Sequence, residues 1–220
     1  MTAALDLFDD AELDGAVAQA VRRIAVAGFK ALWSGRRVTL AELLGDDAAV
    51  TEAADHLLAR GRIEVSDDGH VVAVHGLARR ATRHRIEHAA GVVNTWCALD
   101  AIGIPAALAI DARAVTQCPT CGAGLKVTLS RGQPEPLPGA VLWYPELRCA
   151  HLVDDFCAEA NLFCSPDHLE RWVGDNAGAG TVMTIKQVTE LGRQVWAEVS
   201  DEFGADTDGG QKPQPPSPGT

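Results

Sequence analysis

The chain has 220 residues, of which 47% are hydrophobic and 22% are charged, a balance typical of a globular protein. This balance excludes a fibrous or wholly disordered chain, and no stretch reaches the roughly 20 apolar residues of a membrane span. Nineteen Lys and Arg residues stand against thirty Asp and Glu residues, and this acidic balance argues against general binding to nucleic acid. The first ten residues are acidic and lack the layout of a signal peptide, so we expect a cytoplasmic protein with no membrane partner.

Residues 1–77 predict a helical module followed by a hairpin. Apolar residues at helical spacing predict helices over Ala16–Leu32, Leu40–Leu44 and Ala48–Ala59, and two alternating runs then flank Asp67-Asp68-Gly69, a hairpin signal. This order is typical of a winged helix-turn-helix. However, this segment contains seven Lys and Arg residues against thirteen Asp and Glu residues. The charge therefore favours a structural cover over a DNA-binding module.

Residues 78–203 predict a small core with a mixed sheet flanked by helices, so the expected fold class is α+β. A helix over Glu87–Gly103, ended by Pro105, precedes four short strands. The predicted strands are Ala107–Ile110, Ala112–Gln117, Leu125–Ser130 and Ala140–Trp143. Helices then return over 169–173 and 185–203, the second opened by a capping box of Thr184 and Gln187. Residues 204–220 lack an apolar anchor and predict a disordered tail.

The sequence Trp96-Cys97-Ala98-Leu99-Asp100 places a thiol near an acidic group. On a wheel of the predicted helix, Asp100 falls inside the apolar arc and Cys97 lies at its edge, three positions away. Burial should raise the pKa of Asp100, and such a carboxyl group can accept a proton from a thiol and return it. The alternative interpretation is structural: Cys97 is a core residue, and Asp100 pairs with an arginine such as Arg113.

All six cysteines lie between residues 97 and 164, and their clustering in a reducing compartment favours metal binding or thiol chemistry over disulfides. If folding brings Cys157 to Cys97, two thiolates and the Asp100 carboxylate form a site for a soft metal. The alternative is that Cys157 and Cys164 are two core cysteines that flank a helix turn.

Cys118-x-x-Cys121-Gly122 has the shape of a zinc knuckle, which needs a second pair of ligands. The best candidates for that pair are Cys149 and His151, but one intervening residue is tighter than the usual spacing. A structural zinc at Cys118 and Cys121 is therefore considered but not favoured.

These motifs together resemble those of the organomercurial (alkylmercury) lyases. The pentapeptide 96–100 resembles the signature of this family, and Asp155-Phe156-Cys157 resembles its second catalytic block. The likeness covers most of residues 15–200, including the helix-turn-helix-like part. The further segments that carry it are Gly76-Leu77, Thr82 with His84-Arg85, Ala112-Arg113 with Cys118 and Gly122, Asn161-Leu162-Phe163 with Ser165, and Glu190-Leu191-Gly192-Arg193.

The resemblance implies that residues 78–203 form the catalytic domain, in which Cys97 and Cys157 bind mercury. Asp100 would handle the proton and is a further candidate ligand, while Cys118 would be structural. The implied reaction is protonolysis of an organomercurial to a hydrocarbon, without a required cofactor. Hg(II) would remain between the two cysteines until small thiols or a mercuric reductase remove it. Cys121, Cys149 and Cys164 are additions to the family pattern.

Two other functions remain open from the sequence. A winged-helix metal sensor would bind metal through cysteines and regulate transcription, but the acidic N-terminal part counts against it. A non-catalytic relative would only sequester metal, although it would not need Cys97, Asp100 and Cys157 together. For either function or for the lyase, we expect a monomer or a weak homodimer.

Overall fold

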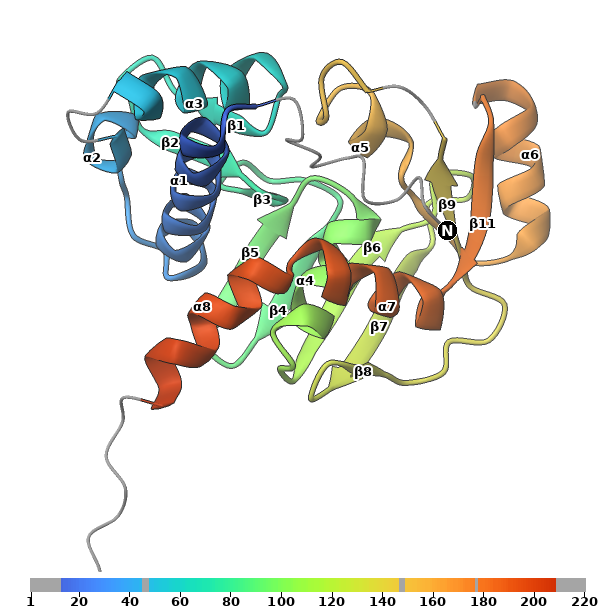
Figure 1. The fold of residues 1–220 in the computed structure, drawn as a ribbon. Coiled ribbons are helices and arrows are strands. Elements are labelled where there is room, and N and C mark those ends of the chain that lie inside the picture. The colour runs from blue at the N-terminus through green and yellow to red at the C-terminus, as the bar shows by residue number, and fades with distance from the viewer. Residues whose placement is uncertain (1–12, 45–47, 147–148, 177, 209–220) are drawn as a thin grey trace, which may run out of the picture.

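An antiparallel sheet of eight strands runs through the computed structural model, which describes residues 13–44, 48–146, 149–176 and 178–208 (Figure 1). In spatial order its strands are β1 (Ile63–Val65), β2 (Val71–Val74), β3 (Leu77–Ala78), β5 (Gly91–Thr95), β4 (Arg85–His88), β6 (Ala112–Gln117), β7 (Gly124–Ser130) and β8 (Gln133–Pro134). A second sheet holds β10 (Leu162–Phe163), β9 (Val141–Pro145) and β11 (Gly180–Thr184). Every pairing in the two sheets is antiparallel, so the α+β class is confirmed but the expected mixed sheet is wrong.

The N-terminal helices are α1 (Gly15–Trp33), α2 (Leu40–Leu44) and α3 (Ala48–Ala59), followed by the β1–β2 hairpin. The three helices and the hairpin therefore occur in the expected order. The hairpin is not separate from the rest of the chain, because β2 pairs with β3 and β3 pairs with β5. Likeness of this unit to a winged helix remains a prediction.

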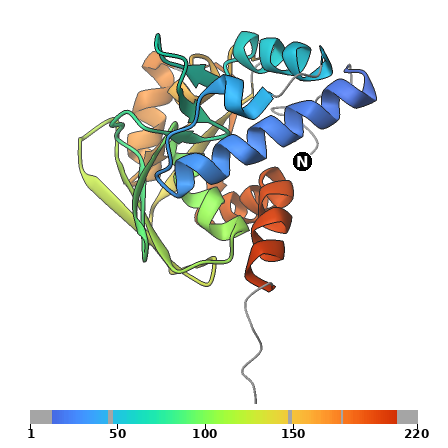
Figure 2. The ribbon, with the colours of Figure 1, turned by 90° about the vertical axis from the view of Figure 1, so that its left-hand side faces the viewer.

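Helix α1 packs against the last helix, α8 (Ala197–Asp208), as Figure 2 shows. The contact is aromatic: the Phe203 ring lies 5.8 Å from that of Phe29 and 6.3 Å from that of Trp33, edge to face in both cases. An exposed ion pair of Lys30 with Glu202 adds little stability. This packing fits a covering role for α1. The predicted tail begins too early, because α8 continues to Asp208, and residues 209–220 lie outside the described part of the chain.

The predicted helix over Glu87–Gly103 is wrong, because residues 85–95 form the β4–β5 hairpin. The β-branched residues Val92 and Val93 favour a strand, and Ile86 supplies the buried side chain of β4. Helix α4 (Ala98–Ala107) begins only afterwards and continues through Pro105. The predicted strand over Ala107–Ile110 is therefore also wrong, since α4 and a turn occupy these residues.

Helix α4 lies between the large sheet and α7 (Ile185–Val195), and every residue of α4 is buried. A Cβ atom at Gly192 of α7 would lie 2.3 Å from the Cα atom of Gly103, so the two helices meet where neither has a side chain. The predicted capping box of Thr184 and Gln187 opens α7, as expected. The remaining helices are α5 (Phe156–Glu159) and α6 (Pro166–Asn176).

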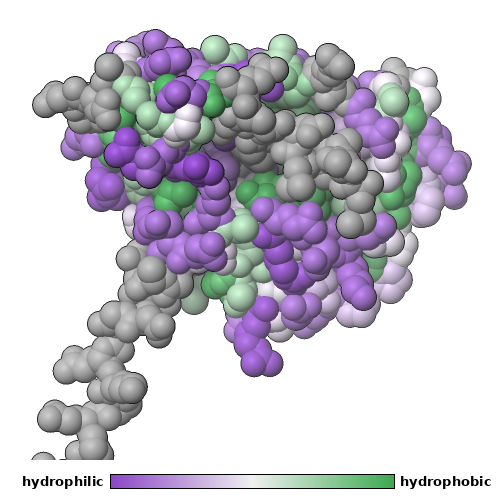
Figure 3. All heavy atoms as spheres, in the orientation of Figure 1, coloured by the Kyte–Doolittle hydropathy of each residue, from purple (hydrophilic) through white to green (hydrophobic). Residues whose placement is uncertain are grey.

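The outer surface is mostly polar on the face shown in Figure 3, where hydrophilic side chains cover much of the area. Among the described helices, none combines the length and the apolar character needed to cross a membrane.

Candidate active site

Cys97 and Asp100 occupy the start of α4, where they form a capping box. The Asp100 carboxylate accepts a hydrogen bond of 2.9 Å from the backbone N–H of Cys97, while the backbone N–H of Asp100 faces the Cys97 side chain. The exchange satisfies N–H groups that a helix N-terminus would otherwise leave without partners. Their closeness thus comes from a helix cap rather than from the predicted apolar arc.

Cys157 reaches the same place from the short helix α5. Its backbone N–H donates to the carbonyl of Leu152 at 3.0 Å, and Asn161 closes the other end of α5 with bonds to the carbonyls of Ala158 and Glu159. The N–H of Ala98, next to Cys97, donates to the carbonyl of Ala160 at 3.1 Å. This bond joins the two segments that carry the cysteines, although they are sixty residues apart.

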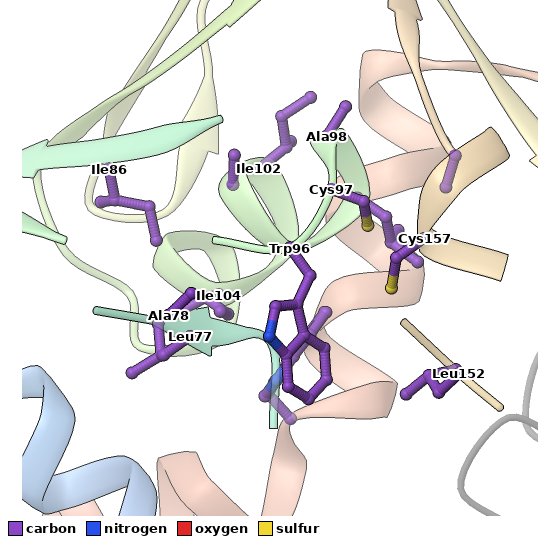
Figure 4. Close-up of a cluster of buried hydrophobic side chains, with 14 of the residues drawn as sticks. Leu77, Ala78, Ile86, Trp96, Cys97, Ala98, Ile102, Ile104, Leu152 and Cys157 are labelled. Atoms are coloured by element: carbon purple, nitrogen blue, oxygen red, sulfur yellow. The ribbon is translucent and has the colours of Figure 1, made fainter. Parts of the chain in front are cut away.

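The Sγ atoms of Cys97 and Cys157 and a carboxylate oxygen of Asp100 all lie within 4.8 Å of one another. Figure 4 shows the two sulfur atoms close together, with the Trp96 ring and Leu152 beside them. All three residues that carry these atoms are buried, with exposed fractions of 0% for Cys97, 4% for Asp100 and 6% for Cys157. The fold therefore brings Cys97, Asp100 and Cys157 together in one buried cluster.

Burial disfavours the charged form of each group in this cluster. It raises the pKa of Asp100 to about 7, against the hydrogen bonds from Cys97, which lower it. Burial likewise raises the pKa of Cys97, and it raises that of Cys157 well above the ordinary thiol value. Near neutral pH, two protonated thiols therefore surround a carboxyl group that can be present in either form.

The alternative role for Asp100, as a partner of Arg113, is wrong. Arg113 is exposed on β6, whereas Asp100 is buried, and among the described residues Asp100 forms no ion pair. The carboxyl group faces thiols and backbone N–H groups instead. A buried carboxyl without a cation is typical of a proton-handling site.

Gly76 lies directly against the Asp100 carboxyl group. An added Cβ atom would lie 3.0 Å from Oδ1 of Asp100, and the φ angle of Gly76 is +94°. We expect Gly76→Ala to destabilise the protein by about 1–3 kcal/mol through backbone strain and to displace Asp100 in addition. Gly35→Ala is the matched control, because Gly35 also has a positive φ but has no atom within 4 Å of an added Cβ.

Thermal melts of both variants measure the backbone strain, and hydrocarbon release from an organomercurial measures the effect of displacing Asp100. Both should be less stable than the wild type, but only Gly76→Ala should lose turnover in its folded state. Equal turnover in the two variants would show that Gly76 does not position Asp100.

A second group of ligand atoms, which the sequence interpretation missed, lies outside this site. Cys118, Cys121, Cys164 and His168 have ligand atoms that all lie within 4.8 Å of one another. The expected partner pair, Cys149 and His151, does not belong to this group. The signal in the sequence was Cys164-x-x-x-His168, which has the spacing of a ligand pair at a helix start.

The family profile and the similar curated proteins all describe alkylmercury lyases. A sequence profile described as alkylmercury lyase matches residues 77–197. The chain is similar to an alkylmercury lyase of Streptomyces lividans, at 27% identity over 74% of this chain and 76% of that protein. It is also similar to an alkylmercury lyase of Pseudomonas putida, at 29% identity over 66% of this chain and 63% of that protein.

The fold is similar to that in the crystal structure of the mercury-bound form of MerB2. The TM-score is 0.80 at 21% sequence identity, over 91% of this chain and 100% of that chain. At this level of identity the likeness concerns the fold.

Proposed function

Because the chain belongs to the alkylmercury lyase family, we propose that it cleaves the carbon–mercury bond of organomercurials by protonolysis, for mercury detoxification. The observation that carries the proposal is the buried cluster of Cys97, Asp100 and Cys157. Thiol sulfur suits a soft ion such as mercury, and a carboxyl group with a pKa of about 7 suits a proton donor at neutral pH.

Capture of the substrate is the first step of this proposal. An organomercurial bound to a small thiol exchanges that thiol for one buried cysteine, whose proton leaves with the released thiol. The product is an R–Hg–S adduct on Cys97 or Cys157. A proton is released in this exchange because burial raises the pKa of both cysteines and keeps them protonated near neutral pH.

Activation follows when the second cysteine gives its proton to the Asp100 carboxylate and its thiolate binds the same mercury. The additional thiolate raises the electron density on mercury and weakens its bond to carbon. Asp100 then delivers the proton to carbon, R–H leaves, and Asp100 returns to the carboxylate form. Overall, one organomercurial and two thiols give one hydrocarbon, Hg(II) held by Cys97 and Cys157, and one small thiol.

The surroundings of the cluster suit this proton transfer. Trp96 and Leu152 are buried beside the sulfur atoms and limit contact with bulk water. In such surroundings a proton on Asp100 passes to a neighbouring group rather than to solvent. Small thiols, or a mercuric reductase, then remove Hg(II) and regenerate the two thiols. No cofactor takes part in this scheme.

The direct test is incubation with phenylmercury and excess small thiol, followed by detection of benzene by gas chromatography. We expect repeated turnovers, with one benzene for each phenylmercury consumed. A gel shift at low salt on the same preparation tests the alternative regulator. Binding to DNA without benzene release would contradict the proposed function, and a single stoichiometric capture of mercury without benzene would indicate a sequestering protein.

A further inference from the structure

The second group of ligand atoms joins two parts of the fold. Cys118 follows β6 and Cys121 lies in the turn before β7, while Cys164 follows β10 and His168 lies in the first turn of α6. The turn is fixed by backbone hydrogen bonds, from Cys118 to Ala123 at 2.9 Å and from Gly122 to Cys118 at 2.8 Å. These four residues, called here the Cys3His cluster, are thus held by the large sheet on one side and by α6 on the other.

One further hydrogen bond joins the two sides of the Cys3His cluster, and another fixes the start of α6 beside it. The Thr120 hydroxyl donates to the carbonyl of His168 at 2.8 Å, and the N–H of His168 donates to the Ser165 hydroxyl at 3.3 Å. These bonds fix the backbone of His168 and use neither ring nitrogen. The fold therefore arranges three thiols and one imidazole before any ligand is added.

The distances within the Cys3His cluster fit tetrahedral zinc. With Zn–S bonds of about 2.3 Å and a Zn–N bond of about 2.0 Å, neighbouring ligand atoms should lie about 3.5–3.8 Å apart. The Sγ atoms of Cys121 and Cys164 are 3.7 Å apart, and Sγ of Cys118 lies 3.7 Å from Nδ1 of His168. Nδ1 of His168 and Sγ of Cys164 are closer, at 3.0 Å, and would separate slightly around an ion.

We propose that Cys118, Cys121, Cys164 and His168 bind a structural zinc ion. Three thiolates and one imidazole complete a tetrahedral shell, so no position stays open for a substrate, as is typical of structural rather than catalytic zinc. Cys118 is buried, Cys164 and His168 are half-buried and Cys121 is exposed, so an ion can enter from solvent. The site goes beyond carbon–mercury cleavage, and it reverses the expectation that a structural zinc at Cys118 and Cys121 is not favoured.

The zinc ion would act on the position of the Cys157 segment. Cys164 lies seven residues after Cys157, and the intervening β10 is part of the small sheet. A zinc ion bound to Cys118 after β6 and to Cys164 before α6 would fix the C-terminal end of the segment from Cys157 to Cys164. The zinc therefore stabilises the arrangement in which Cys157 reaches Cys97.

The test measures zinc without using activity. The full chain is produced in zinc-sufficient medium, purified with a phosphine reductant, and analysed by elemental mass spectrometry. We expect one zinc ion per chain in the wild type, in Cys149→Ser and in the double variant Cys97→Ser/Cys157→Ser, but none in Cys121→Ser. Because Cys121 is exposed, its serine variant should fold. Its melting temperature should fall by about 10 °C or more.

Cobalt substitution gives an independent result. The wild type loaded with Co(II) should show the intense visible bands of a tetrahedral thiolate site, and Cys121→Ser should not. Wild-type protein without zinc would overturn the proposal. So would zinc lost from the double variant but kept by Cys121→Ser. None of these results depends on whether the protein cleaves organomercurials.

Discussion

Cys97→Ser and Cys157→Ser should each reduce benzene release from phenylmercury to the uncatalysed background, whereas Cys149→Ser should stay within about threefold of the wild type. In the proposed mechanism carbon leaves mercury only when two thiolates bind the same mercury, and serine cannot replace a thiolate toward a soft ion. Cys149 is a fair control because it is a half-buried cysteine outside both groups of ligand atoms.

Capture and cleavage should separate in these variants. Each single variant keeps one buried thiol, so it should retain phenylmercury after desalting, and mass spectrometry should find the protein with the intact phenyl–mercury adduct. The wild type should instead carry Hg(II) without the phenyl group. Thermal melts serve as the folding control, because a serine hydroxyl buried without a partner costs about 1–3 kcal/mol of stability.

Two outcomes would contradict the assignment of the thiols. Normal turnover by Cys157→Ser would show that another group supplies the second ligand. Loss of turnover in a folded Cys149→Ser variant would show that Cys149 is one of the two cysteines that bind mercury.

The sequence motifs point to the three residues that meet in the buried cluster, but not to all of the elements that carry them. Local patterns identified α1, α3, β6, β7 and the start of α7, because each has its own periodicity or cap. Local pattern alone predicts a helix from Glu87 to Gly103, because Val92, Val93 and the apolar residues of α4 fit a helical period as well as a strand. The hairpin is recognised from its neighbours in the sheet, since β5 pairs with β3 and β4 pairs with β6, which lies further along the chain.

The Cys3His cluster could not be predicted from local sequence, because its two halves are far apart along the chain. Cys149 and His151 are nearer in sequence to Cys118 and Cys121 than Cys164 and His168 are, and sequence spacing alone points to the nearer pair. The antiparallel β9–β10 pair and α6 bring Cys164 and His168 back to the β6–β7 turn. Asp100 was correctly expected to be buried, but it is buried because α4 is enclosed on all sides and not because it lies on one apolar face.

Asp100→Asn should abolish most turnover while leaving the protein folded and able to capture mercury. Asparagine keeps the oxygen that accepts the N–H of Cys97, so the helix cap persists. It cannot take a proton from the second thiol and deliver it to carbon. Loss of a general acid–base group typically lowers the rate by about 10²–10⁴-fold. The measurements are benzene release and mercury retained after desalting, and near-normal turnover would contradict the proton-handling role.

The same substitution should raise stability in a defined pH range. Burial raises the Asp100 pKa to about 7, against about 3.9 in an unfolded chain, so between pH 4 and 7 the folded wild type binds the extra proton. Its stability therefore falls as the pH rises through this range, by up to about 4 kcal/mol for a shift of about three units. Asparagine does not titrate and escapes this loss.

The difference in unfolding free energy between Asp100→Asn and the wild type should thus be near zero at pH 4 and reach its plateau above pH 7. Denaturant unfolding of both proteins across this range measures it, and other titrating groups cancel because the two chains share them. The buried thiols do not interfere, since their pKa values lie above the range. A difference that is constant with pH, or that favours the wild type at pH 8, would contradict this prediction. It would show that folding does not raise the pKa of Asp100, so that the carboxyl group could not act as a proton donor at neutral pH.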